Sequence, residues 1–188
     1  MIALGLAVGP AGPAWADDVP PGATRNPLPD HTDTAFERAC LNALNADRTV
    51  HHAAPLHISP NLVTYAKHRA DYISRAAGLS AGHHGLDTHY GETLYWAGSS
   101  QPKAAACSEA VRSWYAEGSQ YDYNNPGFSS DTGHFTQVVW ASTTEVGCAR
   151  AAGQDSNIYE TYVVCVYSPA GNITGKFPQN VAPKEMQP

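Results

Sequence analysis

The stretch Gly133–Trp140, with the sequence GHFTQVVW, is the one around which the fold is predicted. Its apolar end, Val138–Trp140, consists of residue types that are most often buried. The glycine before His134 permits a positive φ or a close backbone approach. We therefore expect His134 at the edge of the core, with one face of its ring free. A lone histidine is more often a hydrogen-bonded core residue than a ligand, so the rest of the chain has to decide between these roles.

The composition is that of one soluble domain. The chain has 188 residues, of which 43% are hydrophobic, and this is enough for a single hydrophobic core. The formal net charge of −6 gives no electrostatic support to a nucleic-acid partner. Nine histidines stand against eleven lysines and arginines, and this high ratio raises the question of metal binding.

The N-terminal segment has the pattern of an export signal. Residues 1–16 are small and apolar and end in Ala14-Trp15-Ala16, which is typical of a signal peptide with its cleavage site. The positive n-region is missing, which indicates a truncated start; a plain flexible tail is the alternative. No later stretch approaches the roughly 20 apolar residues of a membrane span. We expect a secreted, extracellular protein that begins near Asp17 and has no transmembrane segment.

Local patterns predict helices first and strands last, which indicates an α+β fold. Thr34 and Glu37 are typical of a capping box, so the first helix is expected from Thr34 to about Arg48. Ser59-Pro60 and Gln101-Pro102 are typical helix starts. The remaining predictions are a second helix that ends at Gly78, a third that ends near Glu117, and strands over 146–150 and 158–166.

Four cysteines fit an exported protein with two disulfides, and none belongs to a CxxC zinc or redox motif. Four cysteines permit three pairings, and the sequence alone leaves the choice open. Cys148 and Cys165 fall on neighbouring predicted strands, which favours the bridge Cys148–Cys165. Cys40 and Cys107, on the inner faces of two predicted helices, then remain for the bridge Cys40–Cys107.

Four segments resemble, in order, elements of the CAP superfamily, which groups cysteine-rich secretory proteins, antigen 5 and plant pathogenesis-related 1 proteins. Gly133–Trp140 is similar to its first signature and Tyr162–Asn172 to its second. Gly91–Tyr95 is similar to its G-E-N-L-Y element, with Thr93 where Asn is usual, and Trp114–Glu117 resembles its W-x-x-E element. The resemblance implies a single CAP domain over residues 33–175. Composition predicts an extended, Pro- and Gly-rich lead-in over 17–32 and a flexible tail over 176–188, which has three prolines and few apolar residues.

The resemblance implies a three-layer α-β-α sandwich with a wide cleft, where two histidines and two glutamates face solvent. His134 comes from the first signature, Glu92 from the G-E element and Glu117 from the W-x-x-E element. The other histidine precedes the G-E element at a variable distance; the candidates, in order of preference, are His84, His89 and His83. In several members the two histidines bind zinc. The implied metal ligands are thus His84 and His134, with both glutamates as their partners.

Three functions are compatible with such a tetrad. Two imidazoles suit Zn²⁺, but catalytic zinc sites usually have three protein ligands, so we expect weak binding that is lost as the histidines protonate. The preferred hypothesis is a non-catalytic module that binds zinc, a lipid or a sterol, with the loop Tyr121–Phe128 along the lipid surface. A structural or host-interaction protein with an extracellular protein partner is one alternative. A metal-dependent hydrolase is the other, although the chain has no HExxH or GxSxG motif.

Overall fold

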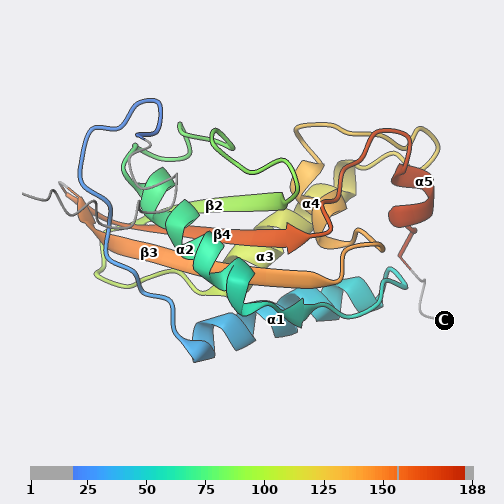
Figure 1. The fold of residues 1–188 in the computed structure, drawn as a ribbon, viewed down its shortest axis with the longest axis horizontal. Helices are drawn as coiled ribbons and strands as arrows, with labels where there is room; N and C mark the ends of the chain where they lie inside the picture. Colours follow the sequence, from blue (N-terminus) through green and yellow to red (C-terminus); the bar gives the residue numbers. More distant parts are fainter. Residues whose placement is uncertain (1–18, 156, 185–188) are drawn as a thin grey trace, which may run out of the picture.

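The computed structural model describes residues 19–155 and 157–184, whose arrangement Figure 1 shows. The predicted signal peptide, residues 1–16, lies outside the described residues. None of the described helices is long and apolar enough to cross a membrane. The elements are, in order, α1 (Thr34–Thr49), β1 (His57–Ile58), α2 (Pro60–Ser74), β2 (Gly91–Ser99), α3 (Cys107–Ala116), a 3-10 helix (Glu117–Gln120), α4 (Gly133–Val138), β3 (Glu145–Asp155), β4 (Ile158–Ser168) and α5 (Phe177–Asn180).

One four-stranded sheet, in the order β1-β3-β4-β2, forms the middle layer (Figure 1). β3 and β4 form an antiparallel hairpin, β2 lies antiparallel to the other side of β4, and the short β1 lies parallel to β3. The two predicted strands, 146–150 and 158–166, are confirmed as parts of β3 and β4. β2 was not predicted, because it begins with glycine and glutamate and ends in small residues that break the strand pattern.

Helices cover both faces of the sheet, so the implied three-layer α-β-α sandwich is confirmed. On one face, Leu62, Ala66 and Ile73 of α2 belong to the same core as Val164 and Val166 of β4. On the other face lie α1, α3 and α4, and the buried side chains of that core include Phe36, Leu44, Trp114, Phe135 and Trp140. β4 is buried on both faces, which explains why its sequence is almost continuously apolar.

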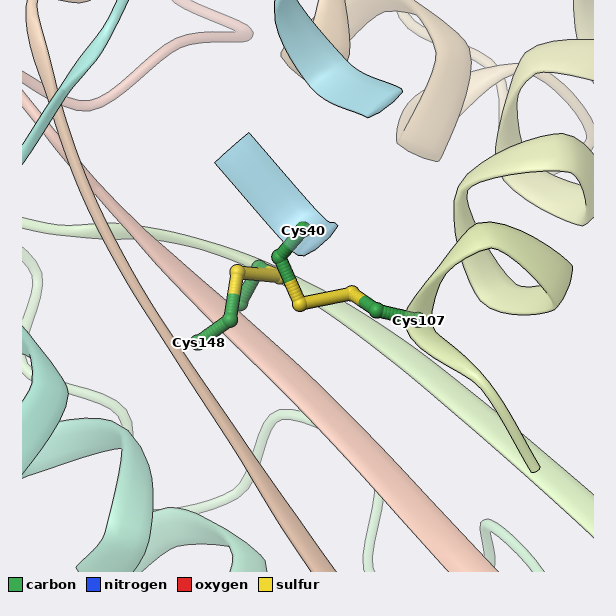
Figure 2. A group of neighbouring side chains, drawn as sticks. Cys40, Cys107 and Cys148 are labelled. Atoms are coloured by element: carbon green, nitrogen blue, oxygen red, sulfur yellow. A yellow bond between two sulfur atoms is a disulfide. The ribbon is translucent and has the colours of Figure 1, made fainter. Parts of the chain in front are cut away.

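Two disulfides meet between the sheet and the α1–α3 layer (Figure 2). Cys40–Cys107 joins α1 to α3, and Cys148–Cys165 joins register partners on β3 and β4. All four sulfur atoms are buried and lie within 4.8 Å of one another. Both bridges favoured from the sequence are confirmed, and such buried disulfides fit an exported protein.

The predicted start of the first helix at Thr34 is confirmed, but its predicted capping residue and the predicted end of the second helix are wrong. Asp33, and not Thr34, caps α1, because its carboxylate accepts a hydrogen bond of 2.7 Å from the backbone N–H of Phe36. α2 ends at Ser74, four residues before the predicted end at Gly78. The backbone after α2 turns away to pair with the lead-in, whose N–H groups donate to a carbonyl at this helix end.

The third helix also begins later than predicted. α3 starts at Cys107 and not at Gln101-Pro102. The backbone of Ala105 is already engaged by side chains of the sheet: its N–H donates to Thr161 Oγ1 at 3.0 Å, and its carbonyl accepts from Arg150 at 2.8 Å. These two contacts hold the chain in a non-helical course until Cys107, and local residue patterns carry no information about them.

Residues 177–182, within the predicted flexible tail, pack against the body of the protein instead. Phe177 is buried edge-on against Trp140, with ring centres 5.1 Å apart. His51 Nδ1 lies 2.7 Å from the carbonyl of Ala182, and burial lowers the pKa of this imidazole. A neutral ring with its proton on Nδ1 donates to that carbonyl. The described end of the chain is thus held by aromatic packing and one histidine.

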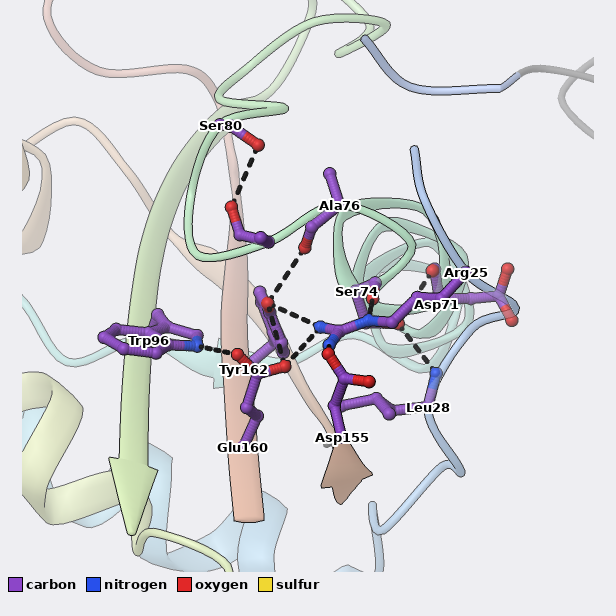
Figure 3. A network of polar contacts seen from close by, with 11 residues as sticks. Arg25, Leu28, Asp71, Ser74, Ala76, Ser80, Trp96, Asp155, Glu160 and Tyr162 are labelled. Carbon is purple, nitrogen blue, oxygen red and sulfur yellow. Dashed lines mark hydrogen bonds and ion pairs between the residues drawn. The ribbon is translucent and has the colours of Figure 1, made fainter. Parts of the chain in front are cut away.

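Arg25 fixes the described part of the predicted lead-in, residues 19–32, to the sheet as a strap (Figure 3). Its guanidinium forms ion pairs with Asp155 and Glu160 at the end of the β3–β4 hairpin. It also donates hydrogen bonds of 2.8 Å to the Tyr162 hydroxyl and to a carbonyl at the end of α2. The side chains of Arg25 and Glu160 are only 13% and 5% exposed, so this pair is shielded from solvent.

Removal of Arg25 would leave Glu160 as a buried carboxylate without its cation. We expect Arg25→Ala to lower the free energy of unfolding by about 3 kcal/mol. Lys67→Ala is the matched control, because the Lys67–Asp30 pair is 40% and 51% exposed, and its loss should cost less than about 1 kcal/mol. Urea unfolding followed by tryptophan fluorescence measures both. Equal losses in the two variants would contradict the anchoring role of Arg25.

Candidate functional site

The short helix α4 carries His134, and buried neighbours hold the helix in place. Phe135, Val138 and Trp140 are at most 1% exposed. Arg48, itself fully buried, donates hydrogen bonds of 2.9 Å to the carbonyls of Val138 and Trp140. Burial lowers the pKa of Arg48 to about 10. Because this value is still well above neutral pH, the guanidinium stays charged. His134 lies on the outer side of α4, where its side chain remains 25% exposed.

Glu117 holds both the backbone and the ring of His134. One carboxylate oxygen accepts hydrogen bonds from the backbone N–H groups of His134 and Phe135, at 3.0 and 3.2 Å. The Glu117 carboxylate therefore caps the N-terminus of α4. The side chain of the N-cap residue, Thr132, makes no capping hydrogen bond. The other oxygen lies 2.7 Å from His134 Nδ1. Because an ionised carboxylate can only accept, the neutral ring carries its proton on Nδ1 and keeps the lone pair on Nε2.

Glu92, on β2, holds the second imidazole of the site. Its side chain is fully buried and lies 2.9 Å from Nδ1 of His83. Arg69 of α2 grips the same carboxylate with two hydrogen bonds, of 2.6 and 3.0 Å. Burial by itself would raise the pKa of the Glu92 carboxyl, but the hydrogen bonds from His83 and Arg69 and the charge of Arg69 outweigh it, so the net pKa is lowered. Glu92 is therefore an ionised carboxylate at neutral pH.

His83, and not the preferred candidate His84, stands opposite His134. The ring centres of His83 and His134 are 6.3 Å apart. His84 faces the other way: its Nδ1 lies 2.8 Å from the Tyr72 hydroxyl, and the two rings are nearly parallel. The rival His89 is 86% exposed and bonds to Asp87. The structure therefore brings His83, Glu92, Glu117 and His134 together, and we replace His84 by His83 in the candidate site.

The choice between adjacent histidines could not be read from the sequence. Residues 79–90 form turns without helical or strand periodicity, and both Gly82 and Gly85 have positive φ angles, of 50° and 74°. Neighbouring side chains in such a loop point in directions that depend on each turn. Arg69 determines which histidine contacts Glu92. Its guanidinium also donates a hydrogen bond of 2.8 Å to the carbonyl of His84 and so fixes the backbone of this loop.

Arg69 is the functional residue that sequence analysis missed. It is 4% exposed and lies between the buried Ala66 and Ala70 of α2. A signal for it was present: Arg69 follows Leu62 by seven residues, and this spacing puts it on the apolar face of the helix. A buried arginine requires an acceptor or a counter-ion, and Glu92 provides both.

The residues present fit a metal ion held by two imidazoles. Both Nδ1 atoms are engaged by carboxylates, so the Nε2 atoms of His83 and His134 are the ones available for coordination. The two ring centres lie 6.3 Å apart, with the ring planes inclined by 55°, so the two imidazoles are neighbours in the site. Among the described residues, the only group of three or more candidate ligand atoms within 4.8 Å of one another is the four disulfide cysteines. The site thus offers two protein ligands, which favours weak binding.

The same contacts make Glu92 a poor general base. A general base must accept a proton near neutral pH. The hydrogen bonds from Arg69 stabilise the ionised form of Glu92 and lower its pKa, so it accepts a proton less readily. Glu117 is engaged by two backbone N–H groups and one imidazole. Neither carboxylate is arranged to take a proton from water, so the geometry favours carboxylates that orient imidazoles over carboxylates that act on a substrate.

Among the hollows in the described part of the chain, two lie outside the tetrad. The larger, with a volume of about 540 Å³, extends along α2 under the strap and is lined by residues that include Leu28, Tyr65, Ala70, Tyr72 and Ala151. The smaller, of about 300 Å³, is formed by residues 120–132 and is lined mainly by polar side chains. Phe128, at the rim of the smaller hollow, is 64% exposed. Both volumes lie within or close to the range of small-molecule sites.

A three-layer α-β-α sandwich with a glutamate-held imidazole on α4 and another before β2 defines a pathogenesis-related 1-like, CAP-type domain. The model of the cysteine-rich secretory protein family (CAP) matches residues 41–167. The chain belongs to this family.

Relatives and solved structures agree with this assignment. Protein PRY2 of Saccharomyces cerevisiae is 39% identical over 150 residues, which cover 79% of this chain and 41% of the yeast protein. Golgi-associated plant pathogenesis-related protein 1 of Homo sapiens is 33% identical over 150 residues, which cover 79% of this chain and 93% of the human protein. The chain thus spans about two fifths of the yeast relative and nearly all of the human one.

Two solved structures share the fold. Venom allergen-like protein 4 of Schistosoma mansoni has a TM-score of 0.55 at 20% identity, over 83% of this chain and 97% of that one. NaASP2, solved with Zn²⁺, has a TM-score of 0.58 at 21% identity, over 84% of this chain and 90% of that one. At these identities the likeness establishes the architecture alone.

The lowered pKa of Glu92 predicts a pH-dependent stability. A depressed pKa contributes stability that is fully present above the unfolded value, near 4.5, and that is lost as the pH falls through the folded value. We expect Glu92→Gln to cost about 3 kcal/mol at pH 7, because it leaves Arg69 buried without its counter-ion. The difference between wild type and variant should shrink as the pH falls below about 4.

Urea unfolding at a series of pH values measures this difference. Glu109→Gln is the control, because Glu109 is exposed on α3, and its replacement should change stability by less than about 0.5 kcal/mol at each pH. A cost of Glu92→Gln that stays constant from pH 7 to pH 3 would contradict the charged pair.

Proposed function

We propose that the chain is a non-catalytic binding module that takes zinc weakly between His83 and His134 and a neutral lipid in the hollow along α2. The observation that carries the zinc part is the pair of Nδ1–carboxylate contacts, which leaves both Nε2 atoms available on facing rings. The structure of NaASP2 with Zn²⁺ supports a metal in this fold. The two disulfides fit the export that residues 1–16 predict.

Zinc titration by calorimetry at neutral pH tests the metal site. We expect saturable binding to wild type, and a loss of at least about 100-fold in affinity for the double variant His83→Ala, His134→Ala. Glu117→Gln should weaken binding by about 10-fold, because the variant loses the carboxylate that orients His134. Binding should also fade as the pH falls and the imidazoles protonate.

His84→Ala and His89→Ala are the matched controls, because each removes one imidazole from the same loop. Neither change should alter zinc affinity more than twofold. If wild type is folded and binds no zinc, the metal part of the proposal is wrong, and a structural role or an extracellular protein partner becomes the better account of the tetrad.

The hollow along α2 favours an uncharged ligand. Of the four lysine and arginine side chains that line it, three have carboxylate partners, in the pairs Lys67–Asp30, Arg69–Glu92 and Arg75–Asp71. The fourth, Arg150, donates to the backbone carbonyls of Ala105 and His31. A fatty-acid anion would have to compete for these cations, whereas a sterol would fill apolar volume and need few polar contacts. The hollow formed by residues 120–132 is more polar, so the loop Tyr121–Phe128 is the second choice for a lipid surface.

Sterol binding followed by native mass spectrometry distinguishes the two hollows. We expect cholesterol to bind wild type more tightly than palmitate, and Tyr65→Ala to reduce the bound fraction several-fold, because Tyr65 lines the α2 hollow. Phe128→Ala is the matched control for loss of an aromatic ring, since Phe128 lies at the other hollow. The opposite result, with Phe128→Ala alone abolishing binding, would assign the lipid to the loop Tyr121–Phe128.

A further inference from the structure

α4 is too short to fix its own position. It has six residues, and its N-cap residue, Thr132, makes no side-chain cap. A helix of this length gains little from its own hydrogen bonds, so the orientation of His134 depends on what holds α4 from outside. Glu117 holds the N-terminal end of α4, and Arg48 holds the carbonyls of Val138 and Trp140 at its C-terminal end. Further hydrogen bonds come from residues 171–172, which follow β4 and lie far from α4 in the sequence.

Three hydrogen bonds join residues 171–172 to α4. The N–H of Gly171 donates to Gln137 Oε1 at 2.9 Å. The side-chain amide of Asn172 is both a donor and an acceptor. Its Nδ2 donates to the carbonyl of Gly133 at 2.8 Å, and its Oδ1 accepts from Thr136 Oγ1 at 2.6 Å. The backbone of Asn172 has φ of 58°, a left-handed conformation that asparagine tolerates better than most residues.

The peptide group between Gly133 and His134 is held from both sides. Its carbonyl accepts from Asn172 Nδ2, and its N–H donates to Glu117 Oε2 at 3.0 Å. The same carboxylate bonds to the His134 ring through its other oxygen. A shift of this peptide would therefore change the distance between the Glu117 carboxylate and the His134 ring. Asn172 and Glu117 fix the position of His134 from the two ends of the same peptide group.

Gln137 extends this support to the other half of the site. A Cβ atom at Gly91 would lie 1.9 Å from Gln137 Oε1, and one at Gly171 would lie 2.7 Å from it. The amide of Gln137, which is 1% exposed, therefore fills the space left by two glycines. Gly91 directly precedes Glu92, so the Gln137 side chain, which bonds to Gly171, also packs against the start of β2. β2 carries the glutamate that holds His83.

We propose that Asn172 is a positioning residue for His134: its side-chain amide fixes the Gly133–His134 peptide and thereby the ring that faces His83. This inference rests on the proposed zinc site for its functional meaning, but not for its geometry. It also gives Asn172 a role other than the glycan acceptor that the pattern Asn172-Ile173-Thr174 suggests, because the acceptor nitrogen is engaged within the protein.

Two variants isolate the contact. Asn172→Gly keeps a residue suited to positive φ and removes both side-chain hydrogen bonds. Asn172→Asp keeps the shape and the acceptor for Thr136, and replaces the donor to Gly133 by an oxygen. The readout is the tautomer of each imidazole in the metal-free protein at neutral pH, from long-range proton–nitrogen NMR spectra. His83 serves as the internal control, since its ring is held by Glu92 and not by α4.

We expect both variants to shift the ring nitrogen resonances of His134, with partial loss of the Nδ1–H form, and to leave those of His83 unchanged. Zinc affinity should fall by about 10-fold in each, as for other residues that orient a ligand. Folded variants with wild-type His134 resonances would overturn the proposal, and if Asn172→Gly does not fold, Asn172→Asp decides. If wild type binds no zinc, the proposed function fails, while the NMR comparison still tests the role of Asn172.

Discussion

The buried ion pair between Arg69 and Glu92 is the interaction on which the arrangement of the site depends. It joins α2 on one face of the sheet to β2 at its edge, and its side chains are 5% and 0% exposed. A buried carboxylate is costly unless it is paired and hydrogen-bonded, and Arg69 meets both requirements. The same guanidinium fixes the backbone of the loop at His84, so one residue determines which histidine reaches Glu92.

The two halves of the site use the same chemistry on different supports. In each, a glutamate accepts from Nδ1 of an imidazole and leaves Nε2 for a ligand. Glu92 is stabilised by a guanidinium, whereas Glu117 is stabilised by the N–H groups at the start of α4. Both carboxylates are thus engaged in orienting the rings, which supports the proposed binding role.

The sequence was informative where chemistry follows from local pattern. The positions of Glu92, Glu117 and His134 followed from the resemblance, and the disulfides Cys40–Cys107 and Cys148–Cys165 from the predicted helices and strands. The sequence was uninformative where contacts over long separations decide. His83, and not His84, contacts Glu92, because Arg69 fixes the backbone of the loop. Residues 177–182 are packed and not a flexible tail, because Phe177 packs on Trp140 and His51 bonds to the carbonyl of Ala182.

The most direct test of the central claim is a zinc titration followed by long-range proton–nitrogen NMR of the nine imidazoles at neutral pH. The account predicts that His83 and His134 carry their protons on Nδ1 before zinc is added. It further predicts that zinc shifts the Nε2 resonances of these two rings together and leaves His84 and His89 unchanged. Zinc-dependent shifts at His84 in place of His83, or protons on Nε2 in the metal-free protein, would contradict it.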